Sequence, residues 1–246
     1  MIDILADLHV HTALSPCADD AMTPPAIVAG ALAEGLAMIA ICDHNSARNV
    51  AAVQAAADAR LTVVAGMEIT SVEECHVLGL FPHAAAAETA GAEVTALLPE
   101  AGDGYIEFFG EQHVLDAHGD IVARETRALA TATPLGVTAC VDLVHRHGGL
   151  AVAAHVDRPS FSVISQLGVF PRDARFDAVE VSRHVASGSE AEARFRAFGL
   201  PVVRSSDGHY LSDLGAAGTR LTVAEATFAE LTLALRADGG RGVADA

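Results

Sequence analysis

Short apolar runs alternate with alanine-rich amphipathic stretches along most of this chain, and that alternation limits the possible folds. Buried apolar strands that alternate with helices predict a parallel sheet or barrel. The expected strands are residues 1–9, 36–44, 61–68, 75–81, 149–155, 176–182 and 200–209. The expected helices are residues 24–35, 49–59, 137–148, 160–168, 189–199 and about 223–236.

The alternation stops between residues 82 and 135. The first part of this segment is alanine-rich, and a later part has the pattern of a hairpin that turns at residues 118–119. Its aromatic residues, Tyr105 among them, argue against a flexible linker. We therefore expect one domain over residues 1–246, with the segment 82–135 as an insertion or cap packed on it.

The charge of the chain restricts its partners. The formal net charge is −17, from 32 acidic and 15 basic residues, and every basic residue is an arginine. Such a surface repels polyanions, so long nucleic acid is an unexpected partner, whereas a few local cations suffice for a small phosphorylated substrate. The absence of lysine excludes a Walker A lysine, a Schiff base and a carbamylated lysine between two metals.

Neither a membrane segment nor a disulfide framework is expected. No apolar run approaches the roughly 18 residues that a membrane helix needs. The beginning of the chain carries Asp3 and Asp7 without a basic cluster, unlike a signal peptide, which predicts a cytoplasmic protein. The four cysteines are far apart in the sequence and include no CxxC pair. This spacing fits neither a zinc knuckle, which needs such pairs, nor a disulfide framework. The oligomeric state is not indicated.

Histidines and carboxylates stand where the apolar runs end. His9 and His11 are two residues apart on the first strand, so they point to one side, which suits either a metal ion or a solvated strand end. Other residues of this kind are Asp43, His44, Glu68, His76, His155, Asp207 and His209. The carboxyl ends of barrel strands share one face. So many imidazoles in one mouth would leave buried polar atoms unpaired without a metal, which favours a metal centre.

Six short motifs carry a family resemblance. DLHVHT, CDHNS, GMEIT, CHVLGLF, AAHVDR and SSDGHYL, in this order, resemble the motif series of the PHP superfamily, named for polymerase and histidinol phosphatase. The resemblance covers nearly the whole chain outside the insertion. It implies an α/β fold, a distorted (β/α)7 TIM-like barrel whose insertion follows the fourth extended run. It also implies hydrolysis of phosphoesters with two or three metals.

The same resemblance implies the ligands of each metal. The first metal is assigned to His9, His11, Glu68 and Asp207. The second, bridged to the first by Glu68, is assigned to His76 and His155. The third is assigned to His44, His209 and a carboxylate from the loop after His11. Imidazole and carboxylate ligands suit zinc, manganese or iron.

The loop after His11 departs from the family pattern. Common members have a short Ser-Asp-Gly there, whereas this chain has the longer SPCADDAMTP. Asp19 is the expected ligand from this loop and Asp20 the alternative. Cys17 would indicate a softer metal.

The expected mechanism uses a hydroxide held between two cations, with the phosphoryl oxygens neutralised by the same cations. The catalytic residues are then expected to be Glu68, Asp207 and His209. Asp7 and Asp43 stand beside ligand histidines and are expected either to orient them or only to be solvated strand ends.

Cations for the substrate phosphate must be arginine or histidine in this chain. The candidates near strand ends are Arg158, His184 and Arg204. Each alternatively pairs with the surplus carboxylates, as surface arginines commonly do.

Three functions remain open. The expected one is a metal-dependent phosphoesterase that acts on a small phosphorylated metabolite or nucleotide, as a phosphatase or phosphodiesterase. An amidohydrolase-type metal hydrolase is the alternative, but the absence of lysine and the closing Asp-Gly-His at residues 207–209 argue against it. The third is a non-catalytic metal-binding PHP module, which the complete set of ligands disfavours.

Overall fold

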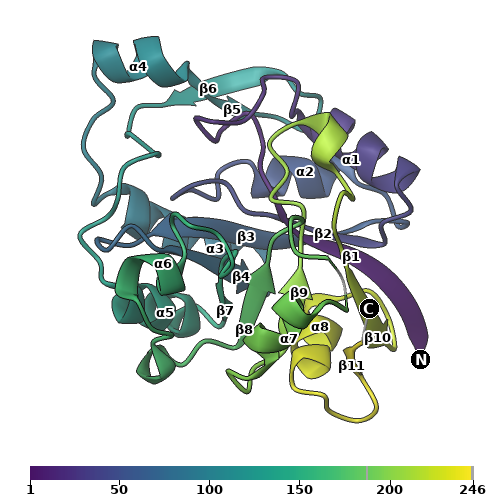
Figure 1. The fold of residues 1–246 in the computed structure, drawn as a ribbon. Coiled ribbons are helices and arrows are strands. Elements are labelled where there is room, and N and C mark those ends of the chain that lie inside the picture. The colour runs from purple at the N-terminus through teal and green to yellow at the C-terminus, as the bar shows by residue number, and fades with distance from the viewer. Residues whose placement is uncertain (187, 245–246) are drawn as a thin grey trace.

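The computed structural model describes residues 1–186 and 188–244. Its main feature is a curled nine-stranded sheet in the order β11-β10-β1-β2-β3-β4-β7-β8-β9 (Figure 1). The strands of this sheet are β1 (Ile2–Val10), β2 (Met38–Ile41), β3 (Thr62–Thr70), β4 (His76–Phe81), β7 (Leu150–Ala153), β8 (Ala178–Val181), β9 (Val202–Arg204), β10 (Thr219–Val223) and β11 (Gly242–Val243). The expected strands are thus present.

The curled sheet almost closes on itself, which confirms the α/β barrel. The end of β1 meets the segment after β9, where Val10 and Gly208 form a parallel bridge. Gly208 accepts a hydrogen bond from the N–H of His11 and donates one to the carbonyl of His9. This closure brings the HVH motif beside the Asp207-Gly208-His209 motif, although they are about 200 residues apart in the sequence.

The sheet is not uniformly parallel, and that part of the sequence-based expectation is wrong. β4 runs antiparallel to both β3 and β7, and β10 runs antiparallel to β1. The connection from β3 to β4, residues 71–75, is too short for a crossover helix, so the two strands form a hairpin. β10 and β11 were not anticipated, because TRLTV and GV are short segments beside turn residues.

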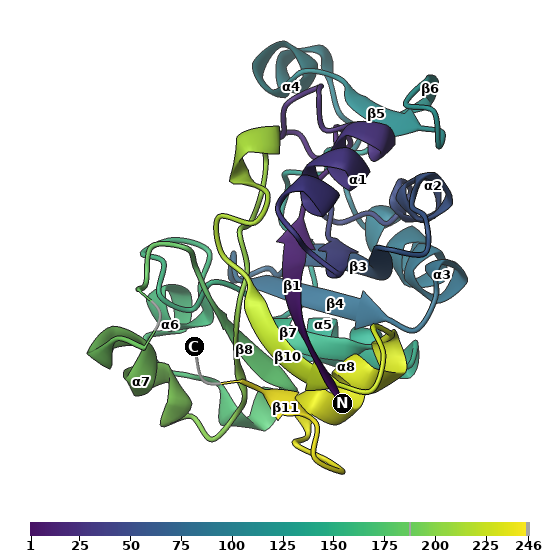
Figure 2. The ribbon, with the colours of Figure 1, turned by 90° about the vertical axis from the view of Figure 1, so that its right-hand side faces the viewer.

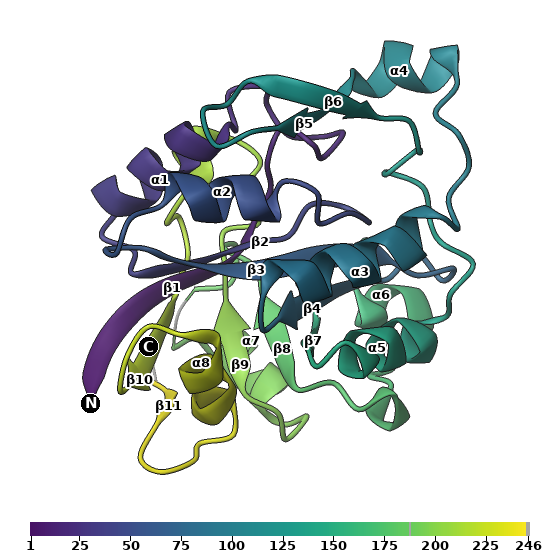
Figure 3. The same ribbon diagram turned by 180° about the vertical axis from the view of Figure 1, so that it is seen from behind.

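The two faces of β3 enter different hydrophobic layers. Val63, Ala65 and Met67 pack against the helices outside the sheet. Val64 instead belongs to a cluster inside the curled sheet. The surrounding helices are α1 (Pro24–Ala33), α2 (Val50–Ala56), α3 (Ala84–Thr95), α5 (Val137–Arg146), α6 (Val163–Leu167), α7 (Glu190–Arg196) and α8 (Phe228–Leu235). Figure 3 shows α2 and α3 along the outer face of the sheet.

The expected insertion divides into two parts in the structure. Helix α3 buries Ala87, Ala90 and Val94 in the same core as the other helices, so it belongs to the barrel. The remaining residues, 99–131, form what we call the cap: α4 (Asp103–Phe109) and the hairpin of β5 (Gln112–Leu115) and β6 (Ile121–Glu125). The predicted hairpin is therefore confirmed, while α4 was not foreseen.

The cap lies over the loop that follows β1. Leu14 of that loop packs with Leu98, Val114 and Leu129 in a small separate core. The N–H of His113 also donates to the carbonyl of Ala13. Figures 1 and 2 show α4 and the hairpin at the end of the molecule away from both termini. The cap is thus held next to the residues that follow the HVH motif.

One helix starts later than its sequence suggested. Helix α6 begins at Val163 instead of residue 160, because the hydroxyl of Ser162 accepts the N–H of Ser165 and caps the first turn. None of the helices in the described ranges is long and apolar enough to span a bilayer.

Candidate metal centre

Two glutamates enter the interior of the barrel at the carboxyl ends of their strands. In β3, Val64 and Glu68 lie an even number of residues apart and face inward, while Met67 faces the helices. In β8, the same alternation places Ala178 and Glu180 inward. Both carboxylates are 1% exposed. A carboxylate so deeply buried requires hydrogen bonds or cations around it.

Imidazoles surround both oxygens of Glu68. Oε1 lies 2.7 Å from Nδ1 of His76 and 3.2 Å from Nε2 of His155. Oε2 lies 2.9 Å from Nδ1 of His44, yet no donor is aligned to hydrogen-bond it. Nδ1 of His155 also lacks a hydrogen-bond partner. Buried donors and acceptors rarely remain unpaired, so this centre has the character of an incomplete coordination site.

The HVH motif reaches Glu68 from the other side. Nε2 of His9 and Nε2 of His11 each lie 3.5 Å from Oε2 of Glu68, and 3.1 Å from each other. Asp207 Oδ1 lies 3.4 Å from His9 Nε2 and 3.2 Å from His11 Nε2. These four side chains converge closely enough to hold one ion. The structure therefore brings together all four residues expected at the first metal.

The charges of the centre are balanced by its histidines. Burial opposes the ionised form of Glu68, but His76, His9 and His44 together hold the pKa of this carboxyl well below its usual range. Burial also opposes a charge on His9, but the carboxylates of Glu180, Asp207 and Glu68 raise its pKa well above the usual value. Burial lowers the pKa of His76 to about 4, against the carboxylate of Glu68, which raises it. A neutral imidazole is the form that binds a metal.

Glu180 orients the ring of His9 and holds the backbone of His155, and it was missed in the sequence. Nδ1 of His9 lies 3.2 Å and 3.1 Å from its two oxygens, and the backbone N–H of His155 donates to Oε2 at 2.9 Å. This contact of Nδ1 with Glu180 turns Nε2 of His9 toward Glu68 and Asp207. One feature of the sequence could have revealed Glu180: it is an isolated acid in the apolar strand AVEV. Glu68 is an isolated acid of the same kind in GMEIT.

Asp43 and Asp7 do not belong to this group of donors, but they bond residues next to it. Asp43 accepts the hydroxyl proton of Ser15, whose oxygen lies 2.8 Å from Nδ1 of His11. Asp43 thus orients His11 through Ser15 and does not bond the ring of the adjacent His44. Asp7 accepts the N–H of Ser206, directly before Asp207, and contacts backbone, not an imidazole ring.

A third group of donors combines His11, His44 and His209. The rings of His11 and His209 stack with their centroids 4.0 Å apart. The exposed Cys17 lines the same small cavity as His44. Partial desolvation opposes the thiolate of Cys17, but the neighbouring His209 and His44 lower its pKa to about 6.

The expected carboxylate ligands of the third metal lie elsewhere. Asp19 is exposed, and its side chain accepts the N–H of Ala21 in a local turn. Asp20 is also exposed and lies 3.5 Å from Nδ1 of His113 in the cap. None of Asp19, Asp20 and Cys17 belongs to the three donor groups found among the described residues. The loop turns so that its thiol, not its carboxylates, faces the imidazoles.

The three residues expected to bind the substrate phosphate lie in different parts of the structure. Arg158 reaches the centre, where it forms an ion pair with Oδ2 of Asp207. His184 is exposed. Arg204 donates to the carbonyl of Val185 and lines a small cavity that none of the expected metal ligands lines. Arg158 is therefore the candidate that the structure places beside the donors.

Strained backbone accompanies the site. Asn45, His155, Phe161 and Asp207 are non-glycine residues with φ of 51°, 27°, 58° and 51°. Such conformations persist where surrounding structure imposes them, and they cluster at functional sites. Two of the four are expected ligands, and a third follows His44.

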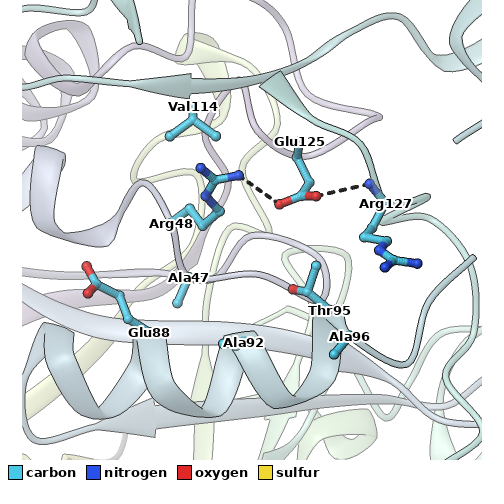
Figure 4. Close-up of a pocket in the computed structure, with 10 residues that line it drawn as sticks. Ala47, Arg48, Glu88, Ala92, Thr95, Ala96, Val114, Glu125 and Arg127 are labelled. Carbon is cyan, nitrogen blue, oxygen red and sulfur yellow. Dashed lines mark hydrogen bonds and ion pairs between the residues drawn. The ribbon is translucent and has the colours of Figure 1, made fainter. Parts of the chain in front are cut away.

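A cavity of about 540 Å³ lies elsewhere, between α3 and the hairpin of the cap. None of the expected ligands is among the described residues that line it. Figure 4 shows Arg48 crossing this space to pair with Glu125 at 3.0 Å. We interpret it as the seam where the cap docks on the barrel, because its walls belong to those two parts.

Comparison with known families agrees with the motifs and the geometry. The model of the PHP domain matches residues 7–167, which is more than half of the chain. This chain belongs to the PHP family. The match agrees with the donor groups described above, which could hold metal ions. A search of curated proteins gives no match.

Solved structures share the fold at low sequence identity. The lesion-specific endonuclease Q from Pyrococcus furiosus superposes with a TM-score of 0.75 at 18% identity, over 98% of this chain and 58% of the endonuclease. A candidate metal-dependent phosphoesterase from Bifidobacterium adolescentis has a TM-score of 0.57 at 21% identity, over 83% of this chain and 87% of the other. An amidohydrolase from Chromobacterium violaceum with bound sulfate has a TM-score of 0.62 at 20% identity, over 87% and 90%.

The endonuclease match bears on the expected partners. Endonuclease Q has also been solved with a 27-mer duplex that carries an abasic lesion at its active site. This chain spans only 58% of that enzyme's length. A similar fold thus occurs in an enzyme that acts on DNA. The net charge of −17 is therefore not sufficient by itself to exclude nucleic acid as a partner of this chain.

Proposed function

We propose that this chain hydrolyses phosphoesters of small metabolites or nucleotides with two or three zinc, manganese or iron ions. The observation that carries the proposal is the convergence of imidazoles on both oxygens of the buried Glu68. We assign the first metal to His9, His11, Glu68 and Asp207, and the second to Glu68, His76 and His155. The donor chemistry fits, since imidazole and carboxylate suit these metals.

The side chains themselves perform three tasks. Glu68, with a pKa held low, supplies negative charge at the centre. His11, whose pKa is well below its usual value because of burial and the neighbouring His209, offers a neutral ring. Arg158, paired with Asp207, provides a cation for a phosphoryl oxygen. When bound, the metals would supply Lewis acidity, which neutralises phosphoryl charge and makes a water nucleophilic near neutral pH.

Metal analysis with a substrate panel tests the proposal. We expect two or three ions of zinc, manganese or iron per chain and turnover of some phosphomonoesters or phosphodiesters. The panel includes nucleotides, a DNA duplex with an abasic lesion, and an N-acyl amide. Calcium or magnesium alone, or no metal after reconstitution, would contradict the metal centre. Turnover of the amide without any phosphoester would favour the amidohydrolase alternative.

We also propose that Cys17, not Asp19, completes the third site with His44 and His209. Two observations support this: Cys17 lines one cavity with His44, and its pKa is lowered by His209 and His44. The Asp19 carboxylate instead accepts a hydrogen bond within its own loop. A thiolate in the site would favour a soft metal.

Cobalt substitution checks this assignment. We expect the cobalt-loaded protein to show a sulfur-to-cobalt charge-transfer band in the near ultraviolet that disappears in Cys17→Ser. The same band is expected to remain in Cys75→Ser, because Cys75 is a buried thiol whose sulfur lies near the carbonyls of Glu73 and Ser162. A band that survives Cys17→Ser, or loss of the third ion in Asp19→Asn alone, would contradict the assignment.

A further inference from the structure

A small cavity opens directly beside the metal centre. It has a volume of about 230 Å³, below the roughly 300 Å³ at which pockets for drug-sized ligands begin. Among the described residues, its lining comprises Cys17, His44, Thr70, His76, Phe109, Ala130 and Phe161. The lining therefore contains donors of the centre on one side and apolar surface on the other, with no arginine and no carboxylate. A second anionic group of a substrate would find no arginine in this lining.

Phe161 is held against the centre in a strained conformation. Its φ is 58°, and its carbonyl accepts the N–H of His76 at 2.8 Å. Its ring stacks on the imidazole of His76, with centroids 4.7 Å apart and planes 17° apart. Nevertheless 42% of the residue is exposed. The fold thus keeps an aromatic face open next to an expected metal ligand, at a conformational cost.

Phe109 approaches the same cavity from the cap. It ends α4, and its ring lies 4.7 Å from that of Tyr105. Tyr105 fixes this end of the cap, because its hydroxyl donates to Gln112 and accepts the N–H of Ala130. Phe109 therefore comes from a different part of the chain than Phe161, yet both line one cavity.

We propose that Phe109 and Phe161 form an aromatic clamp for a flat, uncharged ring in the organic part of the substrate. This deepens the proposed function and rests on it: the substrate is then a phosphoester of an aromatic alcohol or of a nucleoside, not of a polyol or sugar acid. The size of the cavity fits one ring system, and its apolar walls favour stacking. Stacking of a base on an aromatic side chain commonly changes affinity by roughly 5- to 150-fold.

Phosphonates test the clamp because the protein cannot hydrolyse their carbon–phosphorus bond as an ester. Calorimetry on the metal-loaded chain would compare inorganic phosphate, methylphosphonate, phenylphosphonate and the 5′-phosphonate analogue of adenosine monophosphate. We expect the two aromatic ligands to bind at least about 5-fold more tightly than methylphosphonate. A stronger preference for phenylphosphonate indicates an aryl ester, and a stronger preference for the adenosine analogue indicates a nucleotide; both support the clamp.

Three variants separate the clamp from a structural role of the rings. Phe109→Ala and Phe161→Ala are each expected to weaken the aromatic ligands by roughly 5- to 150-fold and to leave methylphosphonate within about twofold. Phe198→Ala is the control, because Phe198 stacks on Phe170 and lines a different cavity. Metal content is measured for each variant, since Phe161 also contacts His76.

The outcomes distinguish the clamp from the function on which it rests. Equal affinity for phenylphosphonate and methylphosphonate, or an equal loss of both in Phe109→Ala, would overturn the clamp and leave the phosphoesterase proposal intact. If the metal-loaded chain binds neither inorganic phosphate nor any phosphonate, the phosphoesterase proposal is overturned, and the clamp with it.

Discussion

Glu68→Gln is expected to lower phosphoesterase activity by at least about a thousandfold, or roughly 4 kcal/mol in the activation free energy. Glutamine keeps the size of the side chain but removes the negative charge that three imidazoles now surround within 2.7–3.2 Å. One of its two polar atoms also becomes a donor, which would face a histidine or a cation. We therefore expect weaker metal occupancy in the same variant, measured by elemental analysis after gel filtration.

His147→Gln is the matched control for this substitution. His147 directly follows α5, and its Nε2 lies 2.9 Å from the carboxylate of Glu93. Neither residue is one of the expected metal ligands. His147→Gln is expected to change activity less than twofold. If Glu68→Gln retains near-normal turnover and full metal content, Glu68 does not link two metals, and the convergence around it has a structural role instead.

The elements and the first donor group were predictable because each follows from local pattern. Short continuous apolar runs and alanine-rich stretches specify strands and helices within a few residues, as in α1 and β4. His9 and Glu68 stand out because polar residues interrupt or end such runs. The ordered motifs then place them in one mouth, since strand ends meet there in a barrel.

What could not be predicted depends on contacts between distant segments. Nothing local in SPCADD decides whether Cys17 or Asp19 turns inward; the choice follows from the side chain of Asp19 bonding Ala21 and from the backbone N–H of Asp19 bonding the carbonyl of His209. Likewise, the antiparallel pairing of β10 with β1 requires the whole barrel. The alanine-rich start of the expected insertion was assigned to the insertion, yet α3 places small side chains in the core of the barrel.

Glu180 is the clearest residue that sequence reasoning missed, and its substitution provides the second large expected effect. Its two oxygens contact Nδ1 of His9, and one accepts the N–H of His155. In Glu180→Gln one of these acceptors becomes a donor, so either His9 changes tautomer or the N–H of His155 loses its partner. Partners of this kind typically change metal affinity or activity by 10- to 100-fold, which is the loss that we expect.

The measurement for Glu180→Gln is competitive metal binding against a chromophoric chelator, accompanied by a thermal melt of the metal-free protein. Glu192→Gln is the matched control, because Glu192 is also a buried glutamate, 2% exposed, that accepts a backbone N–H, from Gly188, outside the centre. If Glu180 acts by orienting His9, only Glu180→Gln lowers metal affinity, while both variants lose comparable stability. Equal metal affinity in the two variants would mean that Glu180 only fills the barrel interior, and that the orientation of His9 is fixed by Glu68 and Asp207 alone.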